Sequence, residues 1–138
     1  SKQPWTGRSD ADVLIRDIAL LLQSEGIGTM GTDIFLADRP DEPDDVIAIY
    51  DTGGFPAEPE LPDLRRTVQI SVRGKSYAAT YSRIWQIYRL LDRPEERLIT
   101  ANGRKMIARA MQPPTLIDRD AASRVLFVFN LQAWTGRD

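Results

Sequence analysis

The sequence predicts a single α+β domain in which a mainly antiparallel sheet is packed by two helices on one face. Two separate stretches, residues 10–24 and 76–91, repeat apolar residues at helical spacing. The stretches around them are short and β-type, so the predicted order is α-β-β-β-α-β-β-β. A length of 138 residues fits one domain. We therefore expect residues 1–138 to form one domain, with residues 1–8 as a flexible N-terminal segment.

The first helix is predicted over residues 10–24. Ser9 can cap its N-terminus, and Gly26 and Gly28 stand where a helix end needs a left-handed residue. Its apolar stripe consists of Val13, Leu14, Ile18, Leu21 and Leu22. We expect this stripe to face the core.

Two short strands are predicted next, over residues 33–37 and 46–50, on either side of the turn-forming stretch Asp38–Asp45. Residues 51–66 then contain two Gly and three Pro and show no periodicity. An irregular stretch of this length inside a compact domain is usually functional or mobile. We therefore expect residues 51–66 to form a long loop or arm.

The middle of the chain predicts a strand followed by the second helix. Residues 67–73 alternate apolar and polar side chains, which is typical of a half-buried strand. In the helix, Pro94 marks the end, and helical spacing favours core packing of its aromatic face over a base-stacking platform. That face consists of Tyr77, Tyr81, Ile84, Trp85, Tyr88 and Leu91.

The last third of the chain is predicted to be all strand. Residues 98–101 and 105–111 flank Asn102-Gly103, the strongest short hairpin signal. The sequence Gln112-Pro113-Pro114 is expected to stop that strand, and Asp118–Asp120 to form a turn. Residues 124–134 form a long strand that is apolar on both faces, which favours the centre of the sheet.

The composition excludes several kinds of chemistry. The chain has no Cys and no His, which removes disulfides, thiolate nucleophiles, Ser-His-Asp triads and Cys or His metal sites. The stretch Gly26–Gly31 fits G-x-G-x-x-G, but it follows a helix and precedes a strand, the reverse of a dinucleotide site. The acids of Asp41–Asp45 lack calcium-loop spacing. We expect no enzyme activity, no cofactor and no metal.

Other classes of protein are disfavoured as well. No run of about 18 apolar residues is present, and the polar stretch Ser1–Asp10 does not resemble a secretory signal. The net charge of −2 argues against a dedicated nucleic-acid binder. We expect a soluble domain made in a reducing cytoplasm, with no membrane contact.

The charge is distributed unevenly along the chain. Residues 38–64 hold nine acidic residues and one basic residue, a net charge of −8, which leaves +6 for the rest because the total is −2. Arginine, the residue suited to bidentate ion pairing, dominates the basic residues. The segment is either a solvated acidic loop or a surface that faces a basic neighbour or lines a channel.

Several phrases of the sequence, in their order, resemble the minor capsid and tail terminator proteins of tailed bacteriophages. The resemblance covers roughly residues 10–134 and includes the helix of residues 77–91. It rests on the phrases Ile34–Asp45, Ile47–Gly54, Val68–Gly74, Asp118–Asp120 and Arg124–Asn130.

This resemblance implies a structural virion protein at the head–tail junction. It implies an α+β subunit that forms a ring, commonly of six, which caps the tail tube and meets the head connector and completion proteins. DNA passes through the lumen of the ring. The resemblance carries no catalytic residues onto this chain.

The candidates for a subunit interface or a lumen surface come from the charge pattern. Because a ring needs a heterologous contact, long loops and edge strands are expected to supply it. The candidates are Asp41, Glu42, Asp44, Asp45, Phe55, Glu58, Glu60, Arg65, Arg66 and Arg73. Two alternatives remain: a monomeric or dimeric adaptor that uses its acidic loop on a basic protein, and a small enzyme that uses the carboxylates of Asp51, Asp118 and Asp120.

Overall fold

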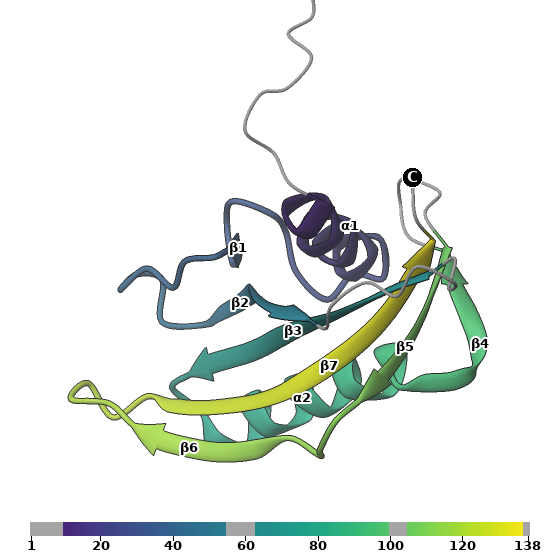
Figure 1. Cartoon of the computed structure of the whole chain (residues 1–138). Coiled ribbons are helices and arrows are strands. Elements are labelled where there is room, and N and C mark those ends of the chain that lie inside the picture. The colour runs from purple at the N-terminus through teal and green to yellow at the C-terminus, as the bar shows by residue number, and fades with distance from the viewer. Residues whose placement is uncertain (1–9, 55–62, 100–104, 137–138) are drawn as a thin grey trace, which may run out of the picture.

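The computed structural model describes residues 10–54, 63–99 and 105–136, with side chains over 14–53, 66–92 and 106–134. These described residues form two helices and seven strands, whose arrangement Figure 1 shows. They are α1 (Asp10–Ser24), β1 (Ile34–Leu36), β2 (Val46–Gly54), β3 (Asp63–Gly74), α2 (Tyr77–Leu91), β4 (Arg93–Ile99), β5 (Lys105–Ala110), β6 (Thr115–Arg119) and β7 (Val125–Gly136).

The strands form one sheet in the order β1-β2-β3-β7-β5-β4, and β6 also pairs with β7. Every pair is antiparallel except β1 with β2. Strands β5 and β6 occupy the same edge of β7: β5 pairs with its C-terminal half and β6 with its N-terminal half. The predicted α+β class with a mainly antiparallel sheet and two helices is thereby confirmed.

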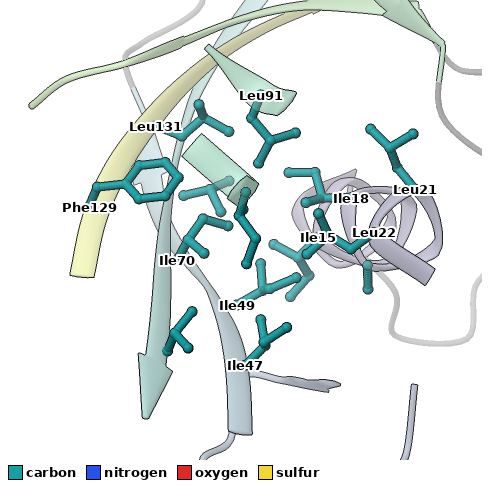
Figure 2. Packing of buried hydrophobic residues seen from close by; sticks show 14 of the residues in the cluster. Ile15, Ile18, Leu21, Leu22, Ile47, Ile49, Ile70, Leu91, Phe129 and Leu131 are labelled. Atoms are coloured by element: carbon teal, nitrogen blue, oxygen red, sulfur yellow. The ribbon is translucent and has the colours of Figure 1, made fainter. Parts of the chain in front are cut away.

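The core lies between one face of the sheet and both helices. Ile49, Ile70 and Phe129 are cross-strand neighbours on β2, β3 and β7, and each is fully buried. Figure 2 shows Ile15 and Ile18 of α1 pointing towards Ile49. Helix α2 adds the fully buried side chains of Ile84, Ile87 and Leu91 to the same cluster. Both helices therefore cover the same face, as the sequence predicts.

Polar contacts hold the two helices in place. Ser76 caps α2, and its hydroxyl accepts a hydrogen bond from Ala79 N–H at 3.1 Å. Further along α2, Arg83 donates to Ile27 O at 3.0 Å and to the Asp33 carboxylate at 2.8 Å. Because Ile27 and Asp33 lie between α1 and β1, this arginine ties α2 to the connection that follows α1.

The structure corrects the prediction that residues 51–66 are loop. Residues 51–54 belong to β2 and residues 63–66 to β3, and residues 55–62 lie outside the described part. The strands extend because β3 has a neighbour on each side, β2 and β7, whose ladders satisfy its backbone groups. A bulge between Asp51 and Gly53, with Gly53 at φ 102°, accommodates the glycine-containing end of β2.

The predicted stop and turn after β5 is also only half right. The chain does leave β5 at Gln112–Pro114, but it then returns to β7 as the additional strand β6. Without β6, the N-terminal half of β7 would present an edge of unpaired backbone groups. The hydrogen bonds gained by pairing with this edge outweigh the turn-forming character of Asp118 and Arg119. The hairpin turn Asn102-Gly103 lies outside the described residues, although β4 and β5 are paired as expected.

The aromatic face of α2 is less buried than the prediction of core packing requires. Trp85 and Tyr88 pack against the core as partly buried residues. Tyr77 and Tyr81, however, are 49% and 45% exposed, so core packing is wrong for these two. The first turns of the helix lie at the rim of the sheet, where no other described element covers them.

We expect the Gly74→Ala substitution to lower the free energy of unfolding by about 1–3 kcal/mol, the usual cost of overpacking. An added Cβ would overlap Oγ1 of Thr80 and lie 2.8 Å from Oδ1 of Asp45. Urea denaturation measures the loss. In a Thr80→Ala background the same substitution should cost less, since the hydroxyl is gone. An equal cost in both backgrounds would show that this contact is not the cause.

Candidate functional site: an acidic loop held by two arginines

The acidic segment singled out in the sequence forms a defined structure at one end of the sheet. We call residues Asp38–Asp45, which connect β1 to β2, the acidic loop. The loop passes over the end of β3 and the start of β7, where it meets Arg73 and Arg124. Both arginines are 6% exposed, so the loop rests on two buried cations.

Arg73, near the end of β3, holds the backbone of the loop. Its guanidinium donates to the carbonyl oxygens of Pro40 (2.6 Å), Asp41 (3.3 Å), Pro43 (2.8 Å) and Asp44 (3.2 Å). Burial, with the nearby positive charge of Arg124 as a second cause, lowers the pKa of Arg73 from its usual value. The four carbonyl oxygens offset that burial because each turns its partial negative charge towards the guanidinium.

Arg124, directly before β7, holds carboxylates as well as backbone. It donates to Asp41 O at 2.6 Å, to Asp41 Oδ1 at 2.9 Å and to Asp120 Oδ2 at 2.8 Å. Hydrogen bonds to Asp120 and Asp41 raise the pKa of Arg124. The pKa of Asp120 shifts in the opposite direction. The backbone and side-chain hydrogen bonds that Asp120 accepts from Arg124 lower it.

The loop turns its backbone inward and its acidic side chains outward. The side chain of Asp41 is 88% exposed and that of Asp44 is 49% exposed, although both lie near Arg124. Glu42 is exposed too, and it precedes a cis peptide bond to Pro43. Asp45 accepts a hydrogen bond from Lys75 N–H at 3.3 Å, so it faces the start of α2. Contacts therefore hold Asp41, Asp44 and Asp45, and all four acids remain open to solvent.

A shallow depression lies beside the loop. Its volume is about 350 Å³. Its lining is made of charged residues of both signs and one leucine: Arg39, Asp41, Arg73, Asp118, Asp120, Arg124 and Leu126. Among the residues that the structure describes, no group of three or more acids is placed to hold a metal ion. The arrangement suits ionic contacts with another macromolecule better than enclosure of a small substrate.

Arg65 and Arg66 lie at the far end of the sheet, near the start of β3. Arg66 donates to Gly53 O at 3.2 Å and pairs with Asp51 at 3.6 Å, so it braces the β2–β3 hairpin. Arg65 pairs with Trp134 through the backbone, and its side chain is not among those described. Phe55, Glu58 and Glu60 lie outside the described residues.

The structure thus divides the predicted site residues into separate groups. It brings Asp41, Glu42, Asp44 and Arg73 together, but the arginine serves the fold of its own subunit. The sequence does not single out Arg124, and it indicates Asp120 as a turn residue and, in the enzyme alternative, as a carboxylate, but not as a partner of Arg124. The spacing Asp120…Arg124 is a local signal that could have found this pair, since Asp120 Oδ1 accepts from Arg124 N–H at 2.9 Å.

Fold and site together define an α+β subunit with a rigid acidic surface and a base of internal ion pairs. A comparison with family models matches residues 21–135 to the family described as bacteriophage tail terminator protein. The match covers well over half of the chain, so this chain belongs to the bacteriophage tail terminator family. The resemblance predicted from the sequence is confirmed. No curated protein matched the chain.

Membership of this family makes the chain a structural protein of the phage tail and implies a component of the virion. It also implies contacts with other phage tail and head proteins. Within the described residues, no helix is both long and apolar enough to cross a membrane.

We expect the Arg73→Lys substitution to lower the free energy of unfolding by about 2–4 kcal/mol, because an ammonium cannot reach four carbonyl oxygens at once. Hydrogen exchange in residues 38–45 should accelerate. The matched control is Arg39→Lys, on an exposed arginine of the same loop, which should change neither quantity. Unchanged exchange in the Arg73 variant would contradict the anchoring role.

A second test concerns pH. Because the pKa of Asp120 is lowered on folding, its contribution to stability is present above the unfolded-state pKa of about 3.9 and is lost as the pH falls through the folded-state pKa. Asp120→Asn should therefore destabilise the protein at pH 6, and the gap from the wild type should close on acidification towards pH 3. Urea titrations of both proteins, with Asp118→Asn as control, measure the gap. A gap that is constant with pH would refute the linkage.

Proposed function

We propose that this protein is the ring-forming terminator at the head–tail junction, which caps the tail tube and lets DNA pass. Membership of the tail terminator family supports this proposal. The structural observation that supports the proposal is the acidic loop. Its acidic side chains are open to solvent, while Arg73 and Arg124 hold its backbone. The ring is expected to contain six copies of the chain.

The acidic loop suits two tasks in such a ring. A surface that is already ordered loses little conformational entropy when it docks on a basic neighbour, such as an arginine-rich face of the next subunit, the tail tube protein or the head connector. Carboxylates that face a lumen repel phosphates, and no counterion-release affinity builds up as DNA slides past. Both tasks need the acids where the structure has them, outward and rigid.

The proposal assigns the protein no reaction. Its family is structural, and the ion pairs of Arg124 with Asp41, Asp44 and Asp120 stabilise the loop. We therefore place the protein in the virion, assembled from self-contacts and from contacts with tail tube and head completion proteins.

A second candidate function is an adaptor that acts as a monomer or dimer and offers its acidic loop to one basic protein. The exposure of Asp41, Glu42 and Asp44 favours it, because an acidic surface alone does not require a ring. Native mass spectrometry separates the two functions. The terminator predicts closed rings, alone or once tail tubes are added, whereas a monomer or dimer under both conditions would favour the adaptor.

Reversal of the charge on the loop should weaken assembly without loss of the fold. We expect the double substitution Asp38→Lys and Glu42→Lys to reduce ring formation or tube binding by about tenfold or more, since both residues are exposed on the acidic loop. The thermal midpoint should stay within a few degrees of the wild type. Glu25→Lys, an exposed acid beyond the end of α1, is the control. Undiminished assembly of the double variant would exclude the loop from the interface.

A further inference from the structure

An exposed aromatic surface lies at the rim of the sheet, on the face that α2 covers. Tyr77 and Tyr81 of α2 stack with ring centroids 6.1 Å apart and planes 10° from parallel. Both rings meet the buried Phe127 edge-on, at 5.4 and 5.8 Å. Leu116 of β6 is the cross-strand partner of Phe127, so it lies on the same face, and it is 44% exposed. We call Tyr77, Tyr81 and Leu116 the aromatic ledge.

The ledge is rigid and apolar, and the described elements leave it open to solvent. Phe127, which is 2% exposed, fixes both tyrosine rings from below. Stacked aromatic side chains of this kind recognise proline-rich segments, because a polyproline II helix is already extended and loses little entropy on binding. The chemistry of the ledge therefore suits a proline-rich chain.

The sequence of this protein contains such a chain. The segment Phe55–Pro62 reads Phe-Pro-Ala-Glu-Pro-Glu-Leu-Pro, with Pro56, Pro59 and Pro62 at every third position. Polyproline II has three residues per turn, so a segment in this conformation would present its three prolines along one side.

Charge complementarity favours the same pair. The segment carries Glu58 and Glu60. The ledge begins at the N-terminus of α2, whose dipole end is positive, and the exposed Lys75 stands just before it. The first turn of α2 contains no acidic residue, and just before it Asp45 accepts a hydrogen bond from the Lys75 N–H. The two glutamates would add further negative charge beside the exposed Lys75.

The segment of one subunit cannot reach the ledge of the same subunit. Its attachment points, Gly54 and Asp63, lie at one end of the sheet, whereas the ledge lies level with Val72 at the other end. The run of β3 from Asp63 to Val72 spans about 30 Å at the usual rise per strand residue. An eight-residue segment fixed at both ends extends only about 15 Å from its base. Figure 1 shows β6 and the start of α2 at the opposite end of β3 from its first residues.

We propose that the Phe55–Pro62 segment of one subunit docks on the aromatic ledge of a second copy of this chain. The donor and the acceptor surfaces differ and lie at opposite ends of the sheet, so each subunit can give one contact and receive another. A heterologous contact of this kind closes into a ring when the rotation between subunits allows it. The inference rests on the proposed function only for the closure of the ring, and not for the contact itself.

Cysteine cross-linking tests the contact, because the chain contains no cysteine of its own. A full-length Glu58→Cys chain, labelled with ¹⁵N, is mixed with an unlabelled Ser82→Cys chain and treated with a short bis-maleimide. Ser82 is exposed and follows Tyr81 on α2. Only a contact between subunits can give the mixed-mass dimer. We expect its yield to exceed, by about tenfold, that of a control mixture in which Glu25→Cys replaces Ser82→Cys.

Two further sets of variants keep the result from resting on one substitution. Pro56→Ala, Pro59→Ala and Pro62→Ala together in the Glu58→Cys chain should reduce the yield to the control level, and they leave the ledge untouched. Tyr77→Ala with Tyr81→Ala in the Ser82→Cys chain should do the same, with circular dichroism to verify the fold.

The outcomes separate this inference from the proposed function. A cross-linking yield equal to the control, under conditions where native mass spectrometry shows rings, would overturn the docking contact. The proposed ring would not be contradicted by that result. A yield that survives the proline substitutions would also overturn it. A specific cross-link in a protein that forms no ring, even on tail tubes, would support the docking contact and contradict the terminator ring.

Discussion

The antiparallel pairing of β3 with β7 positions every other feature of this molecule. The two strands pair along 12 residues, from Asp63 opposite Gly136 to Gly74 opposite Val125. On one face their apolar side chains form the floor of the core that both helices cover. At one end of the pair stand Arg73 and Arg124, which hold the acidic loop. A shift of one residue in this register would turn the core side chains to the wrong face and would separate the two arginines.

Arg73 and Arg124 offset the electrostatic repulsion within the acidic loop. Four acids between Asp41 and Asp45 repel one another and favour an extended, mobile chain. Arg73 counters this tendency through the loop carbonyl oxygens and Arg124 through Asp41 and Asp120, while Glu42 stays in solvent. The loop is thus ordered without loss of its outward negative charge. This combination fits a protein whose partners must find a preformed surface on the end of a tail.

The fold class could be predicted from the sequence because periodicity and order are local signals. The ends of β2 and β3 and the whole of β6 could not, because their strand conformation depends on pairing partners distant in the chain. At the site, the charge pattern pointed to the acidic loop, but the pairing of Arg124 with Asp41, across 83 residues, appears only once β7 lies beside β3. The sequence indicates Arg73 only as a candidate interface or lumen residue, whereas its role inside the subunit follows from its contacts with the loop carbonyl oxygens.

The growth of tail tubes tests the central claim most directly. If this protein is the terminator, its addition to polymerising tail tube protein should stop elongation, and electron micrographs should show a ring at one end of each tube. The mean tube length should fall as its concentration rises. Tubes of unchanged length with bare ends, at concentrations of this protein well above that of tube ends, would contradict the account.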